Sequence, residues 1–183
     1  MPRIAAPTLA EHRRLQRAAL LGAATEILVT RGALAVTPAA VGAAAGLARS
    51  SVYQYFSSGA GIIAAIIEDA FPRSNELMRE ALDGLTQPWD IVDAYVRETL
   101  RQAADGAHRP AAALRTAALP SECLDRLGEL HREQIGPLHR AVLALEAPEP
   151  HITGQLIGGM LEAAMGAVEA GADAEAVTER SLE

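Results

Sequence analysis

The sequence has a single cysteine, Cys123, among 183 residues. An intrachain disulfide and a zinc site built from several cysteines are therefore excluded. The longest apolar run, around residues 62–67, is far shorter than the roughly 18 residues that a membrane span needs. The N-terminal segment also lacks the cleavage-site pattern of a signal peptide. We therefore expect a cytoplasmic protein with no membrane partner.

Aromatic residues make up only 3% of the chain, and the β-branched residues that favour strands are sparse. Half of the residues are hydrophobic, and alanine, the strongest helix former, is abundant throughout. A chain of this length has room for a small head and a larger body. These features predict an all-α protein with a substantial core.

Lysine is absent, so arginine carries all of the positive side-chain charge apart from histidine. The net charge is −7, but it is unevenly distributed. Residues 1–59 contain six arginines and two acids (6 − 2 = +4), whereas residues 60–183 contain ten arginines and 21 acids (10 − 21 = −11). A basic head on an acidic body is the asymmetry expected when only one end of a protein contacts nucleic-acid phosphates.

Helical spacing of apolar residues, interrupted by glycine and proline, divides the chain into elements. We predict an N-terminal arm over residues 1–14, which is flexible because it contains two prolines near its start. A head follows over residues 15–60 and a helical body over residues 61–183. The expected helices cover residues 15–30, 38–45, 49–56, 61 to beyond Pro72, 88–104, 109–118, 121–145, 152–170 and 173–182.

Residues 37–56 have the pattern of a helix-turn-helix. Gly46 can form the tight turn because glycine adopts positive φ without strain. Thr37 can cap the first of the two short helices, which begins at Pro38. Apolar anchors face inward from both helices and the turn: Val41, Ala45, Leu47, Val52 and Tyr55. The polar residues that remain on the outer face can read base edges or phosphates in a major groove: Arg49, Ser50, Ser51 and Gln54. An ordinary helical hairpin in an alanine-rich bundle is the alternative.

In this context the chain resembles the N-terminal domain of the tetracycline-repressor (TetR) family from about Leu15 to Ile67. The matching motifs are Ala23-Ala24-Thr25-Glu26-Ile27-Leu28, Arg31-Gly32, Thr37-Pro38, Val41, Ala45-Gly46-Leu47, Val52-Tyr53-Gln54-Tyr55-Phe56 and Ser58. The resemblance implies that Thr37 contacts phosphate as well as capping. It places Arg49, Ser50, Ser51 and Gln54 on the base-reading face, and assigns Tyr53 and Tyr55 to phosphate contact or packing. Three positions depart from the family pattern: Gly59 replaces a lysine, Gly42 an alanine and Leu28 a phenylalanine.

The resemblance also implies that the body supplies an effector pocket and a dimer interface built by the last two long helices. The candidate pocket residues are the scarce polar and aromatic ones: Trp89, Tyr95, His108, Cys123 and His131. The candidate interface residues are Leu156, Gly159, Met160, Ala163 and Met165, although the same pattern also suits a plain core helix. His131 and His139 stand eight apart, not four, so we expect no metal site.

The leading hypothesis is a ligand-responsive DNA-binding transcriptional regulator. It would be a homodimeric repressor that a small-molecule effector releases from a palindromic operator in double-stranded DNA. No cofactor is expected. An all-helical enzyme is disfavoured because no nucleophile, base and orienting group are suitably spaced. A helical dimeric adaptor whose head has lost DNA binding remains a second alternative, since Gly59 removes one charged contact.

Overall fold

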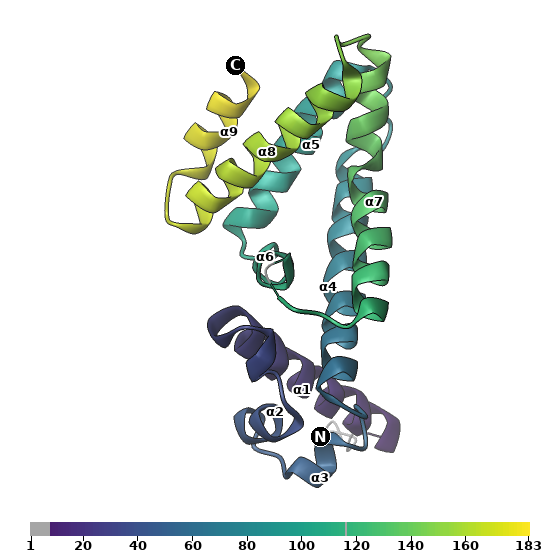
Figure 1. The fold of residues 1–183 in the computed structure, drawn as a ribbon, viewed down its shortest axis with the longest axis vertical. Helices are drawn as coiled ribbons and strands as arrows, with labels where there is room; N and C mark the ends of the chain where they lie inside the picture. Colours follow the sequence, from purple (N-terminus) through teal and green to yellow (C-terminus); the bar gives the residue numbers. More distant parts are fainter. Residues whose placement is uncertain (1–7, 116) are drawn as a thin grey trace, which may run out of the picture. The chain divides into compact units, whose positions relative to one another are not determined.

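A computed structural model describes residues 8–115 and 117–183, and within these ranges every regular element is a helix (Figure 1). The prediction of an all-α fold is therefore confirmed. No helix in these ranges is long and apolar enough to cross a membrane. The helices are α1 (Leu9–Arg31), the 3₁₀ turn η1 (Ala33–Ala35), α2 (Pro38–Ala44), α3 (Arg49–Val52), α4 (Gly59–Ala81), α5 (Pro88–Ala104), α6 (Arg109–Arg115), α7 (Ser121–Ala144), α8 (Pro150–Glu169) and α9 (Ala174–Leu182).

The first helix starts earlier than the sequence pattern suggested. The Thr8 side chain accepts a hydrogen bond from the Glu11 backbone N–H, and the Glu11 carboxylate accepts one from the Thr8 backbone N–H. This reciprocal capping box fixes the start of α1 at Leu9. The predicted arm of residues 1–14 is thus corrected for residues 9–14, which are helical, while residues 1–7 lie outside the described residues.

The chain divides into two compact units. Of the described residues, unit 1 comprises 8–68, 112–115 and 117–123, and unit 2 comprises 69–111 and 124–183. Helix α4 contributes its first ten residues to unit 1 and the remainder to unit 2. Unit 1 therefore holds the predicted head together with a later segment of the chain, and unit 2 holds most of the predicted body.

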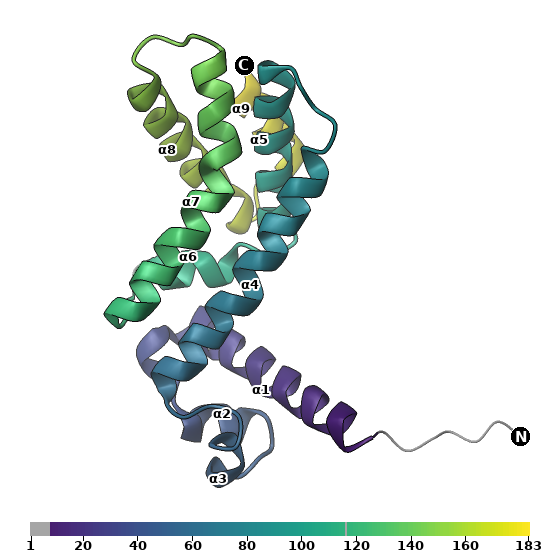
Figure 2. The same ribbon diagram turned by 90° about the vertical axis from the view of Figure 1, so that its right-hand side faces the viewer.

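Unit 1 is built around α1, with α2 and α3 packed as a pair (Figure 2). Helix α1 buries Leu20, Ala24 and Leu28, which recur every four residues and so form one apolar face. Val41 of α2 and Val52 of α3 are fully buried as well. The three helices thus share a small aliphatic core, as the helix-turn-helix pattern predicted.

Unit 2 has its core where α5 packs against α8 and α9 (Figures 1 and 2). Buried members of this cluster include Val96 and Leu100 from α5 and Leu161 and Val168 from α8. Tyr95 belongs to the same cluster, and burial raises its pKa to about 12. Tyr95 is only 6% exposed and is therefore a core residue.

Candidate functional site

The corner between α2 and α3 is formed at Gly46, which has a φ of +69°. The backbone N–H of Leu47 donates to the carbonyl of Gly42 at 2.8 Å and closes the turn. At the other end of α2, the Thr37 hydroxyl accepts a hydrogen bond from the Ala40 N–H at 3.2 Å. The predicted turn glycine and the predicted cap are both confirmed, because a left-handed residue and a side-chain acceptor occupy those two places.

Two glycines of unit 1 allow close backbone approaches. A Cβ atom on Gly42 would lie 2.8 Å from the carbonyl oxygen of Leu47 and 3.0 Å from Cγ2 of Val52. A Cβ atom on Gly59 would lie 2.8 Å from the carbonyl oxygen of Val36. Both positions depart from the TetR pattern, and both departures remove a side chain where the backbone leaves no room for one.

The Gly59 contact gives a first testable result. We expect Gly59→Lys to lower the free energy of unfolding by about 1–3 kcal/mol, because the new Cβ would press against a backbone atom that cannot move independently. Ala60→Lys is the matched control, since it adds the same charge at an exposed position that already carries a Cβ. Urea unfolding of the two variants measures the difference. Equal stabilities would show that Gly59 is not required by packing.

The outer face of α3 presents polar side chains to solvent. Arg49, Ser50 and Gln54 are exposed, Tyr53 is 45% exposed, and Ser51 is half-buried. Val52, in contrast, is completely buried. Helix α3 ends at Val52, earlier than the predicted range of 49–56, so Tyr53 and Gln54 lie in the turn that follows it. The apolar residue still faces inward and most of the hydrogen-bonding residues face outward, as the sequence pattern predicted.

Tyr55 is oriented differently from Tyr53. Its hydroxyl donates a 2.6 Å hydrogen bond to Oε1 of Gln16 on α1, and its side chain is half-buried. Of the two roles that the resemblance implied for Tyr55, the structure shows packing against the first helix. Tyr53 has its hydroxyl on the exposed side, where it accepts a 2.9 Å hydrogen bond from Nη2 of Arg49.

Unit 1 also carries exposed arginines without an acidic partner in the described part of the chain. Three of them, Arg13, Arg14 and Arg17, lie on α1, and Arg31 lies at its end. The Arg17 guanidinium stacks over the Phe56 ring at 5.5 Å, which still leaves its charge uncompensated. Because no acidic side chain of the described residues neutralises these cations, they are available to an anionic partner.

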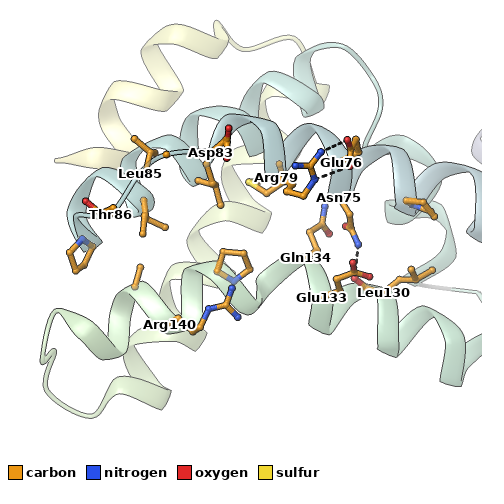
Figure 3. Close-up of a pocket in the computed structure, with 18 of the residues that line it drawn as sticks. Asn75, Glu76, Arg79, Asp83, Leu85, Thr86, Leu130, Glu133, Gln134 and Arg140 are labelled. Carbon is orange, nitrogen blue, oxygen red and sulfur yellow. Dashed lines mark hydrogen bonds and ion pairs between the residues drawn. The ribbon is translucent and has the colours of Figure 1, made fainter.

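A cavity of about 860 Å³ lies within unit 2, between α4 and α7 and under the segment that leads into α5 (Figure 3). Its apolar wall includes Met78, Leu82, Leu85, Ile91, Leu130 and Ala141. The volume of this cavity is within the range that small-molecule sites have. Polar and charged residues complete the wall: Asn75, Glu76, Arg79, Asp83, Thr86, Arg126, Glu133, Gln134 and Arg140.

Several of the polar groups of the cavity are already paired. Arg79 forms a two-point ion pair with Glu76 one turn earlier on α4. The hydrogen bond from Arg79 is the main reason that the pKa of the Glu76 carboxyl is lowered. Nδ2 of Asn75 donates to the Leu130 carbonyl at 3.4 Å, whereas its buried Oδ1 has no partner among the described residues. The cavity thus has apolar walls, a polar end near Asn75 and Gln134, and further polar groups toward Thr86 and Arg140 (Figure 3).

Behind this polar end, a hydrogen-bond chain connects three helices of unit 2. Gln134 of α7 donates to the Ser74 hydroxyl at 2.7 Å, and Ser74 of α4 donates to Gln102 of α5 at 2.5 Å. Gln102 in turn donates to the Glu98 carboxylate at 2.7 Å. Burial by itself would raise the pKa of Glu98, but hydrogen bonds from Arg101 and Gln102 outweigh it and hold this pKa below its usual value. Glu98 therefore stays ionised at neutral pH, and the series of hydrogen bonds from Gln134 to Glu98 stays complete.

None of the five predicted pocket residues lines this cavity. Tyr95 is in the core, and Trp89 is exposed beside Pro88 and Ile91, which do line it. His108 contacts Glu169 at 3.2 Å, and His131 is exposed. Cys123 is buried and belongs to unit 1, and burial raises the pKa of its thiol.

The cavity residues carry a sequence signal of a different kind. On α4 they recur at positions 72, 75, 76, 78 and 79, and on α7 at 130, 133, 134, 137 and 141. Both series follow helical spacing, so each marks one continuous helix face. The prediction selected rare residue types instead of facing helical stripes.

Helix α8 exposes an apolar face. Ile152, Leu156 and Met160 are 52%, 70% and 36% exposed and stand four residues apart. Gly159 and Ala163 are exposed beside them. Met165, which was predicted with this set, is instead buried in the core of unit 2. Four of the five predicted interface residues therefore share one solvent-facing surface, together with Ile152. We name this surface the α8 face, and its residues are Ile152, Leu156, Gly159, Met160 and Ala163.

Known proteins share both the head sequence and the whole fold. Residues 20–66 match the family model for bacterial regulatory proteins of the tetR family. AibR, solved in complex with isovaleryl coenzyme A and operator DNA, superposes with a TM-score of 0.79 at 13% identity, covering 91% of this chain and 96% of that one. A TetR-like transcriptional regulator from Rhodococcus sp. RHA1 has a TM-score of 0.78 at 18% identity, with coverages of 97% and 94%.

A third structure, a TetR-family transcriptional regulator from Bordetella parapertussis 12822, has a TM-score of 0.77 at 21% identity and covers 91% of each chain. No curated protein matches the chain in sequence. Residues 20–66 are therefore a tetR-family N-terminal domain, and the chain as a whole has the fold of the TetR-family transcriptional regulators.

Proposed function

We propose that this chain is a homodimeric transcriptional regulator that binds operator DNA through α3 and responds to a small-molecule effector bound in the cavity of unit 2. The observation that carries the proposal is the exposed face of α3. Arg49 and Ser50 project from this short helix behind a sharp glycine corner, and Gln54 projects from the turn directly after it, where a major groove can receive them. The tetR-family match to the same segment supports this role.

Phosphate contacts in the proposed complex come from several groups. The unpaired arginines of unit 1 supply positive charge, and the Thr37 and Tyr53 hydroxyls supply hydrogen bonds. The predicted phosphate role of Thr37 is compatible with its capping role, since a hydroxyl that accepts from Ala40 still has its own proton to donate. We propose no phosphate contact for Tyr55, whose hydroxyl donates to Gln16.

The dimer is proposed to form through the α8 face. A large leucine that is 70% exposed, flanked by small residues, is typical of a helix that packs closely against a partner helix. Leu143 at the end of α7 is also more than half exposed and belongs to the other long helix near the C-terminus. A two-fold dimer would present two α3 helices to a palindromic operator.

The effector is proposed to bind between α4 and α7. AibR, which has the same fold, was solved with an acyl thioester of coenzyme A, so a short acyl thioester is the first compound to test. Helix α4 lines the cavity with its second half and belongs to unit 1 with its first ten residues. An effector that favours one conformation of α4 can therefore alter DNA affinity through differential binding to the two states. We propose no catalytic role for this chain. We also propose that it lies in the cytoplasm, since it has to reach DNA to act as a regulator.

A titration of labelled DNA tests this proposal. The probe is the region upstream of the chain's own coding sequence, and the readout is fluorescence anisotropy across a series of salt concentrations. We expect sequence-preferring binding whose affinity falls about tenfold or more between about 50 and about 200 mM salt, because arginine–phosphate contacts release counterions. A dimer with no measurable affinity for any duplex would overturn the proposal and favour a helical adaptor.

A further inference from the structure

Arg49 and Tyr53 are connected to each other on the exposed side of α3. The guanidinium Nη2 donates a 2.9 Å hydrogen bond to the Tyr53 hydroxyl, and the guanidinium carbon lies 5.5 Å from the centre of the Tyr53 ring. Both side chains are exposed, and the residues stand four apart, one helical turn from each other. Hydrogen bonding and cation–π attraction thus act together on a single arginine.

This double contact restricts a side chain that would otherwise be mobile. A free arginine at the surface samples many rotamers, and holding it in one orientation costs conformational entropy. Nη2 uses one of its N–H groups on Tyr53, and the remaining N–H groups of the guanidinium stay free for another acceptor. The tyrosine hydroxyl accepts in this bond, so its own proton stays available for a phosphate oxygen.

We infer that Tyr53 is a positioning residue for sequence readout, which holds the Arg49 guanidinium ready for the edge of a guanine base. The inference rests on the proposed function, since it concerns the same DNA-binding face. Arginine recognises guanine through two parallel hydrogen bonds to O6 and N7, so the orientation of its plane matters. A tyrosine that fixes this plane contributes to discrimination between sequences, in addition to any contact of its own with phosphate.

The two roles of Tyr53 can be separated, because a phosphate contact carries no sequence information. Loss of such a contact weakens binding to every duplex by the same factor. Loss of the Tyr53 hydrogen bond that orients Arg49 weakens binding only to duplexes in which Arg49 reads a base. The informative quantity is therefore the discrimination ratio, defined as the Kd for a scrambled duplex divided by the Kd for a preferred duplex, from which the phosphate contribution cancels.

The experiment measures this ratio for the full-length protein. The preferred duplex is one that the wild-type protein selects from a random-sequence pool, and the scrambled duplex has the same length and composition. We expect Tyr53→Phe, which keeps the ring but removes the acceptor, to lower the ratio about threefold to tenfold. In an Arg49→Ala background the same change should leave the ratio constant within about twofold. If Arg49→Ala binds too weakly to measure, Arg49→Lys serves as the background, since it keeps the charge but cannot make the two-point contact.

Tyr55→Phe is the matched control, because it removes a tyrosine hydroxyl that donates to Gln16 and not one that contacts Arg49. It should leave the ratio unchanged. The inference would be overturned if Tyr53→Phe kept the wild-type ratio. It would also be overturned if Tyr53→Phe lowered the ratio equally in the wild-type protein and in the Arg49-substituted protein. Either result would leave the proposed function intact. A wild-type protein that selects no duplex at all would overturn the proposed function itself.

Discussion

Leu156→Glu is expected to convert the dimer into a monomer and to weaken binding to an operator by about 100-fold or more. Leu156 is the most exposed large side chain of the α8 face, so a carboxylate there costs little in the isolated subunit. In the proposed dimer the same carboxylate would be buried without a partner, which is strongly unfavourable. Loss of the dimer would lower the DNA affinity, because two linked heads bind a palindrome far more tightly than one head does.

Sedimentation equilibrium and DNA titration check this result together. Leu124→Glu is the control, since Leu124 is a 50% exposed leucine of α7 outside the α8 face. The control should remain dimeric and bind DNA with wild-type affinity. A wild-type protein that is monomeric at micromolar concentration, or a Leu156→Glu variant that stays dimeric, would show that the α8 face is not the interface.

Gly42→Ala is expected to destabilise unit 1 by about 1–3 kcal/mol, even though alanine is the better helix former. The new methyl group would lie 2.8 Å from the Leu47 carbonyl oxygen and press on Val52, so α2 and α3 would have to separate. Because that separation disturbs the corner at Gly46, DNA affinity should fall as well.

Gly22→Ala makes the same chemical change with the opposite outcome. Gly22 lies on the exposed side of α1, and a Cβ atom there would meet nothing within 4 Å. We expect this variant to be more stable than the wild type by up to about 1 kcal/mol, since only the helix-propensity gain remains. Chemical unfolding of the pair measures the contrast. A Gly42→Ala variant as stable as Gly22→Ala would contradict the close approach of α2 to α3.

The head could be predicted from sequence because its determinants are local. Gly46 has the positive φ that the turn requires, Thr37 caps the helix that follows it, and Val41 and Val52 are the apolar residues of the two short helices on either side of the turn. The prediction of a flexible arm follows from the prolines near residue 1, whereas the start of α1 is determined by the Thr8–Glu11 capping box. That signal is local too, so it was available in the sequence.

The cavity could not be predicted in the same way, because it depends on which helix faces meet in space. Asn75 and Gln134 stand some sixty positions apart, and only the packing of α4 with α7 brings them to one cavity. Tyr95 is a residue type that often contacts ligands, yet the packing of α5 against α8 buries it in the core. The close approaches at Gly42 and Gly59 likewise depend on distances between backbones, about which the residue type alone says little.

Selection of duplexes from a random-sequence pool by the purified wild-type protein tests the central claim most directly, namely that α3 reads DNA as one of a symmetric pair. The enriched sequences should contain an inverted repeat whose half-sites are centred about one helical turn, roughly 10 base pairs, or a small multiple of that apart. They should no longer be enriched when the selecting protein carries Arg49→Ala. A pool that shows no enrichment after repeated selection, or an enriched motif that is indifferent to Arg49, would contradict this claim.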